Sequence, residues 1–124
     1  VVDGTAKDYL LQNAICTVIP SRISEGSSLT ALEAFAAGRP VVAADVPGLR
    51  EAVRPHQTGL LFPEDDARAL SDALLYVLHR PHEAQCWGDA ARRYVAPFDW
   101  RRIAERHLEL YDSLTSRGVR RRAA

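Results

Sequence analysis

Two carboxylates, Glu25 and Glu33, are the side chains of this chain whose spacing suggests shared chemistry, with seven residues between them. A carboxylate repels a phosphate, but it accepts two hydrogen bonds at once and can therefore hold the two hydroxyls of a diol. The pair predicts a site for hydroxyl groups. The alternative interpretation is two unrelated, solvated glutamates, one in a loop and one on a helix.

The residues between the two carboxylates predict the start of a helix. Ser28 suits the N-cap position, because its hydroxyl can accept a hydrogen bond from a free amide of the first turn. The stretch Leu29–Ala37 consists mostly of strong helix formers. The free amides at a helix start favour an anion such as a phosphate. A ligand with an anionic centre and hydroxylated ends, as in a nucleotide sugar, would satisfy the amides and both carboxylates.

The flanking segments predict strands on both sides of this helix. Ala14–Ile19 is an apolar, β-rich run, preceded by a short expected helix at Asp8–Gln12 whose large apolar residues lie on or near its buried side. Gly38 suits a left-handed helix end, and Pro40 cannot continue the helix. The run Val41–Ala44 is typical of a buried parallel strand. Because open α/β sheets bind ligands at the carboxyl ends of their strands, the helix start is predicted to lie at a binding edge.

After a third short strand at Leu60–Phe62, the pattern predicts helices only. The first is capped by Asp65 or Asp66 and runs to His79. The others are expected at 82–95 and 100–116, the last of them capped by Asp99. Residues of this last helix recur at helical spacing and form an apolar stripe: Ile103, His107, Leu110, Tyr111 and Leu114. The expected fold class is α/β, a Rossmann-like parallel sheet flanked by helices and ending in three consecutive helices.

Composition sets broad limits on the protein. With 124 residues, 26% charged residues and zero formal net charge, the chain is expected to form at most one soluble globular domain. No basic excess points to nucleic acid as a partner. Cys16 and Cys86 lie far apart and predict reduced thiols in a cytoplasmic setting. Trp87 and Trp100 are expected in core or interdomain packing.

Several cofactor and metal signatures are missing from the sequence. It contains neither a G-x-G-x-x-G run nor a Walker loop. The four histidines do not cluster at metal-ligand spacing, and His107 is interpreted as a hydrogen-bonded structural residue on an apolar helical face. We therefore expect no metal site and no cofactor.

Short motifs follow one another in a recognisable order along the chain: Pro20–Ser21, Glu25–Gly26, Glu33–Ala34, Ala37–Gly38, Pro40–Val42, Gly48, Glu51, Thr58–Leu61, Phe98 and Trp100. This order resembles the C-terminal domain of retaining glycosyltransferases with the GT-B fold, the glycosyltransferases group 1 or family 4 type. The similarity covers Ala14 to Tyr111. The chain departs from the group at Ser27–Ser28, where an apolar-small pair such as Phe-Gly is common, and this leaves the identity of the transferred sugar open.

The resemblance implies a role for each matching residue. Glu25 would be catalytic, lying against the donor sugar and stabilising its developing positive charge. Glu33 would accept hydrogen bonds from the two ribose hydroxyls. No metal is required in this scheme. The backbone amides that would contact the donor sugar and phosphate belong to Gly26, Ser27, Ser28, Leu29 and Thr30.

The resemblance also implies a domain organisation and an activity. Residues 1–116 would form the second half of a nucleotide-sugar-binding domain, without the acceptor-binding N-terminal domain, and this part alone is expected to be inactive. The parent enzyme would transfer a hexose from a nucleotide diphosphate sugar to an acceptor hydroxyl with retention of configuration. The alternative is a non-catalytic module that binds nucleotide sugar or pairs with another subunit.

The segment 117–124 forms a basic tail with four arginines. One interpretation is a solvated chain end. The other is weak peripheral contact with an anionic membrane surface at the inner face, which would suit a lipid-linked acceptor.

Overall fold

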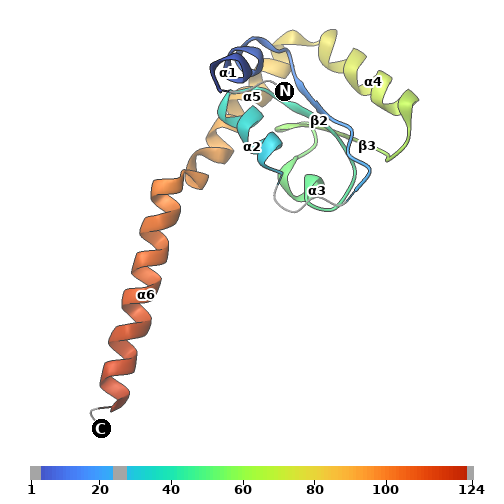
Figure 1. Cartoon of the computed structure of the whole chain (residues 1–124). Coiled ribbons are helices and arrows are strands. Elements are labelled where there is room, and N and C mark those ends of the chain that lie inside the picture. Colours follow the sequence, from blue (N-terminus) through green and yellow to red (C-terminus); the bar gives the residue numbers. More distant parts are fainter. Residues whose placement is uncertain (1–3, 24–27, 123–124) are drawn as a thin grey trace.

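The computed structural model describes residues 4–23 and 28–122. Figure 1 shows a body made of helices and a small sheet, from which the last helix projects. The elements in chain order are α1 (Gly4–Asn13), β1 (Thr17–Ile19), α2 (Leu29–Ala36), β2 (Val41–Ala44), α3 (Leu49–Ala52), β3 (Gly59–Phe62), α4 (Ala67–Leu78), α5 (Pro81–Val95), the 3-10 turn η1 (Ala96–Phe98) and α6 (Trp100–Arg122).

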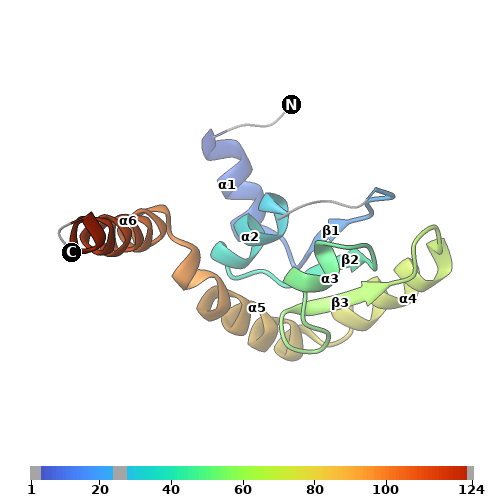
Figure 2. The same ribbon diagram turned by 90° about the horizontal axis from the view of Figure 1, so that it is seen from below.

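The three strands form one parallel sheet in the order β1-β2-β3, with Thr17 opposite Val41 and Val42 opposite Leu60. Helix α2 packs on β1 and β2, α4 packs on β2 and β3, and α5 contacts both β3 and α2. Figure 2 shows the strands side by side within this body, with α1 and α2 near one another. The predicted α/β class with parallel strands and three terminal helices is confirmed.

The hydrophobic core centres on β2, all four residues of which are buried. The inward face of α2 contributes Ala31, Ala34 and Phe35, each fully buried. Trp87 on α5 is also buried, as expected for a core tryptophan. Because burying a large apolar side chain contributes roughly 1.5–3 kcal/mol, these residues fix α2 and α5 against the sheet.

The ends of the helices follow the local signals in the sequence. The Ser28 hydroxyl accepts a hydrogen bond from the Ala31 amide at 3.4 Å, so Ser28 is the N-cap of α2. Asp66 caps α4 through the Ala69 amide at 2.8 Å. Gly38 has a φ of +72°, in the left-handed region expected after the helix.

Helices α2 and α5 approach each other closely just beyond the end of α2. A Cβ atom added at Gly88 would lie 2.1 Å from the Gly38 carbonyl oxygen, closer than real atoms approach. The Arg92 guanidinium donates a hydrogen bond to the Ala37 carbonyl oxygen at 3.0 Å. The end of α2, and with it the direction of the helix, is therefore held by α5.

Helix α6 leaves the body of the molecule instead of packing on it (Figure 1). Only Ile103 of its predicted apolar face is half-buried, whereas Leu110, Tyr111 and Leu114 are exposed. The predicted stripe is therefore left largely unpacked in the described chain. Trp100 is 78% exposed, so a core position for it is wrong, whereas interdomain packing stays a prediction. The helix also continues past Ser116, its predicted end.

The N-terminal helix is longer than the predicted Asp8–Gln12 and packs less. Leu11 is half-buried against the core, but Tyr9 and Leu10 are exposed, which contradicts the prediction for them. None of the helices in the described part of the chain has the length and apolar character that crossing a membrane requires.

Candidate functional site

The candidate site lies where α2 begins, on the edge of the sheet formed by the carboxyl ends of the strands. In the unit β1–α2–β2 the chain leaves the end of β1, starts α2 near that edge and returns through β2. Ser28 is buried and holds the Ala31 amide. The backbone N–H groups of Leu29 and Thr30 lie in the first turn, so the helix itself offers them no carbonyl oxygen as a hydrogen-bond acceptor. These amides and the helix dipole make the start of α2 suited to an anion.

Glu33 lies one turn into α2, on the same side of the helix as Leu29. Its side chain is 46% exposed, and its Oε1 atom accepts a hydrogen bond from Lys7 Nζ on α1 at 2.7 Å. Because of this bond and the charge of Glu33, the pKa of Lys7 is raised above its usual value. Glu33 is therefore an accessible carboxylate beside the anion-attracting helix start, with one oxygen in an ion pair.

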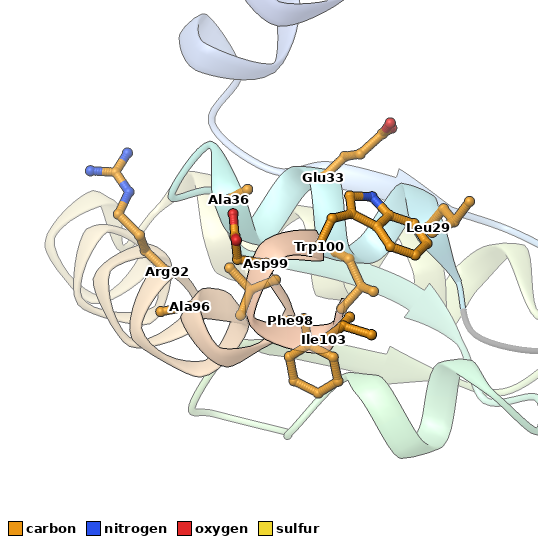
Figure 3. A pocket seen from close by; sticks show the side chains of 11 residues that line it. Leu29, Glu33, Ala36, Arg92, Ala96, Phe98, Asp99, Trp100 and Ile103 are labelled. Atoms are coloured by element: carbon orange, nitrogen blue, oxygen red, sulfur yellow. The ribbon is translucent and has the colours of Figure 1, made fainter. Parts of the chain in front are cut away.

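A cavity of about 680 Å³ lies between α2 and the junction of α5, η1 and α6. Leu29 and Glu33 line it on the α2 side, and Phe98 and Trp100 line it on the other. Figure 3 shows the Trp100 ring lying over this cavity, while the Glu33 carboxylate points away from Phe98 and Trp100. Arg92 and Asp99 add polar side chains to the lining.

The structure describes part of the predicted site. Ser28, Leu29, Thr30 and Glu33 come together on the first turns of α2. Glu25, Gly26 and Ser27 lie outside the described residues. The roles of all seven residues stay predictions.

The loop that follows β1 contacts the start of α4. Arg22 Nε donates to Asp65 Oδ1 at 2.5 Å, and both side chains are largely exposed. Beside them, Pro20, Ser21 and Asp66 help to line a cavity of about 220 Å³. The two residues are 43 positions apart, so helical spacing in the sequence gives no signal for this pair. An exposed pair of this kind contributes little to stability, about 0–1 kcal/mol.

Titratable groups outside the site form no metal centre in the described residues, since no group of three or more His, Cys, Asp or Glu side chains could hold an ion there. Both cysteines are free thiols. Burial raises the pKa of the Cys16 thiol, which is half-buried as an apolar residue would be. His107 Nδ1 lies 2.8 Å from the Ile103 carbonyl oxygen, so this histidine is hydrogen-bonded within its own helix, but it is exposed.

Lys7 and the cavity-lining Arg92 and Asp99 are the polar residues near the site that sequence reasoning missed. Lys7 meets Glu33 across 26 sequence positions. Helical spacing reports neighbours three or four residues apart, so it contains no signal for such a contact.

The fold and the helix-start site together define an α/β domain suited to a ligand with an anionic group and hydroxyls. The sequence model of the family described as glycosyl transferases group 1 matches residues 2–94. The chain belongs to this family, and the resemblance noted in the sequence is confirmed.

Individual proteins show the same relationship. The chain is 30% identical to the phosphatidyl-myo-inositol mannosyltransferase of Mycobacterium leprae (strain TN) over 117 residues, which is 94% of this chain and 31% of the relative. Sucrose-phosphate synthase from Thermosynechococcus elongatus has a TM-score of 0.81 and 39% identity, covering 93% of this chain and 30% of that structure. Anabaena Alr3699/HepE in complex with UDP has a TM-score of 0.73 at 19% identity, covering 86% and 29%, and supports the fold alone. The chain spans about a third of the length of these proteins.

Proposed function

We propose that this chain forms the donor-binding part of a retaining hexosyltransferase, which moves a hexose from a nucleotide diphosphate sugar to an acceptor hydroxyl. One observation carries the proposal: the start of α2, capped by Ser28, presents the amides of Leu29 and Thr30 beside the accessible carboxylate of Glu33. The amides suit the diphosphate and the carboxylate suits the ribose diol.

In this proposal Glu25 acts at the reacting sugar. The bond between the anomeric carbon and the diphosphate breaks with positive charge developing on the sugar, which a nearby carboxylate stabilises. The negative charge of the departing diphosphate is stabilised by the amides at the start of α2. Fixed charges and dipoles aimed at developing charge are a major source of catalysis.

Two substitutions separate binding from chemistry. Glu33→Ala removes an interaction made equally in the ground and transition states, so it should weaken both donor and free nucleotide diphosphate, by roughly 1.5–3 kcal/mol. Glu25→Ala should leave free nucleotide affinity nearly unchanged and lower turnover. Nucleotide calorimetry and transfer kinetics on the longest natural protein that contains this chain measure both effects.

Glu109→Ala on α6 is the matched control, because its side chain is exposed and far along the sequence from the site. Loss of nucleotide binding in Glu25→Ala with no effect of Glu33→Ala would contradict the assigned roles. Nucleotide binding without any transfer would favour a non-catalytic binding module. Absence of both would favour a subunit-pairing module.

We also propose that the parent enzyme works in the cytoplasm, with its basic tail at an anionic membrane surface. The two free thiols support a reducing compartment. The name of the Mycobacterium relative places a phosphatidylinositol lipid at its reaction. A lipid-linked acceptor would bring the enzyme to such a surface.

A further inference from the structure

We propose that Lys7 is a positioning residue for Glu33, and that it strengthens the preference of the site for a ribose diol over a deoxyribose. This inference rests on the proposed function. It concerns a residue of α1, which lies before the run of motifs from Pro20 to Trp100. It assigns a specific role to an ion pair that helical spacing does not predict.

Lys7 occupies a fixed place because α1 is anchored to the body. Leu11, one turn after Lys7, is half-buried against the core. The Arg39 guanidinium, just after α2, donates a hydrogen bond to the Gln12 carbonyl oxygen at the other end of α1. These two contacts hold α1 beside α2, so that Lys7 Nζ reaches Glu33 Oε1 at 2.7 Å.

Glu33 lines two cavities, and the ion pair with Lys7 sets which of them the Glu33 carboxylate approaches. One is the cavity of about 680 Å³ that Phe98 and Trp100 line. The other, of about 310 Å³, lies between α1 and α2 and is lined by Asp8, Leu11 and Gln12. Figure 3 shows the carboxylate turned away from the aromatic cavity. The ion pair therefore holds it on the side of α2 that faces α1.

The ion pair leaves Glu33 able to bind a diol. Lys7 uses one acceptor position of Oε1, and each carboxylate oxygen has two. Oε2 and the second position of Oε1 can therefore accept from two neighbouring hydroxyls. A carboxylate already held in one orientation loses less conformational freedom when the ligand binds, so the affinity for that ligand rises. A lysine is protonated at neutral pH, and the hydrogen bond to Glu33 raises the pKa of Lys7 further.

The test measures affinity by calorimetry for UDP, GDP and ADP, each beside its 2′-deoxy counterpart, on the longest natural protein that contains this chain. Lys7→Met should weaken the ribonucleotides by about three- to tenfold, the range expected when one side chain must be ordered on binding. It should weaken the deoxynucleotides less, because they lack one hydroxyl of the diol. Lys7→Arg keeps the charge and should recover most of the affinity.

Two further variants show whether Lys7 acts through Glu33. In a Glu33→Gln background, Lys7→Met should have no additional effect. Arg80→Met is the matched control: it removes a comparably exposed ion pair, with Glu83, at the start of α5, and should not change nucleotide affinity. Thermal unfolding of each variant verifies that it folds.

Three results would overturn the inference: unchanged affinity in Lys7→Met, tighter binding in Lys7→Met, or an equal loss for ribose and deoxyribose forms. If Glu33→Gln weakens the ribonucleotides while Lys7→Met is silent, Lys7 has no positioning role and the proposed function stands. If Glu33→Gln is also silent, the proposed ribose site itself fails.

Discussion

At the scale of single residues, the positions that fix the site are those where little space is available. Gly88 lies against the Gly38 carbonyl oxygen, and an added Cβ atom would come within 2.1 Å of it. This contact, with the hydrogen bond from Arg92 to Ala37, holds the end of α2 against α5. The candidate site lies at the start of the same helix. The position of the site therefore depends on Gly88, which is far away in sequence.

Gly88→Ala should destabilise the protein by about 1–3 kcal/mol, because α5 must move away from backbone that cannot give way. The better helix propensity of alanine, worth up to about 1 kcal/mol, offsets this only in part. Urea unfolding measures the change. Gln85→Ala, on the exposed side of the same helix, should stay within about 0.5 kcal/mol. A more stable Gly88→Ala variant would show that α2 and α5 are not in such close contact.

At the scale of elements, α6 contrasts with α5. Its sequence has helical periodicity, yet Leu110, Tyr111 and Leu114 are exposed, and the helix projects from the body (Figure 1). In contrast, α5 buries Ala84, Trp87, Gly88 and Ala91. An apolar stripe therefore has different meanings in the two helices: in α5 it belongs to the core, and in α6 it contributes little to the stability of the body.

Truncation after Ala104 should change the melting temperature of the chain by less than about 4 °C, because it leaves the half-buried Ile103 in place and the described side chains that it removes, those of 105–115, are exposed. Trp87→Ala is the contrasting variant, and it should cost about 3–5 kcal/mol, because it empties a buried position. Circular dichroism melting compares the two. A truncated chain without a cooperative transition would mean that α6 packs on the body in solution.

At the scale of the whole molecule, the charge is unevenly distributed. Four of the sixteen basic residues and none of the sixteen acidic residues lie in 117–124, so the rest of the chain has four more acidic than basic residues. The zero net charge of the chain is therefore the sum of a basic segment, 117–124, and an acidic remainder. An anionic surface would attract the tail and repel the body.

This charge asymmetry predicts that the protein binds an anionic membrane surface through residues 117–124. In sedimentation with vesicles that contain anionic lipid, the chain should bind weakly, and removal of 117–124 should abolish the binding, since each arginine near such a surface contributes about 1 kcal/mol. Added salt should weaken the binding by screening. Neutral vesicles serve as the control. Equal sedimentation with and without the tail would leave it a solvated chain end.

The sequence by itself determined the features that depend on neighbouring residues. Ser28 and Asp66 cap helices through amides three positions away, and Gly38 takes the left-handed conformation that ends α2. The apolar run Val41–Ala44 is the central strand, as its composition indicated. These features follow from hydrogen bonds and side-chain preferences within one or two turns of chain, which residue types and spacing record directly.

Only the tertiary structure decided which distant residues meet and which apolar faces stay exposed. Lys7 reaches Glu33 from 26 positions away, and Gly88 meets Gly38 because α5 packs against the end of α2. The stripe of α6 has the spacing of a buried face but has no neighbour in the described chain to cover it. The physical reason is that burial and long-range pairing are properties of how elements pack, and the periodicity of one element is the same with or without a partner.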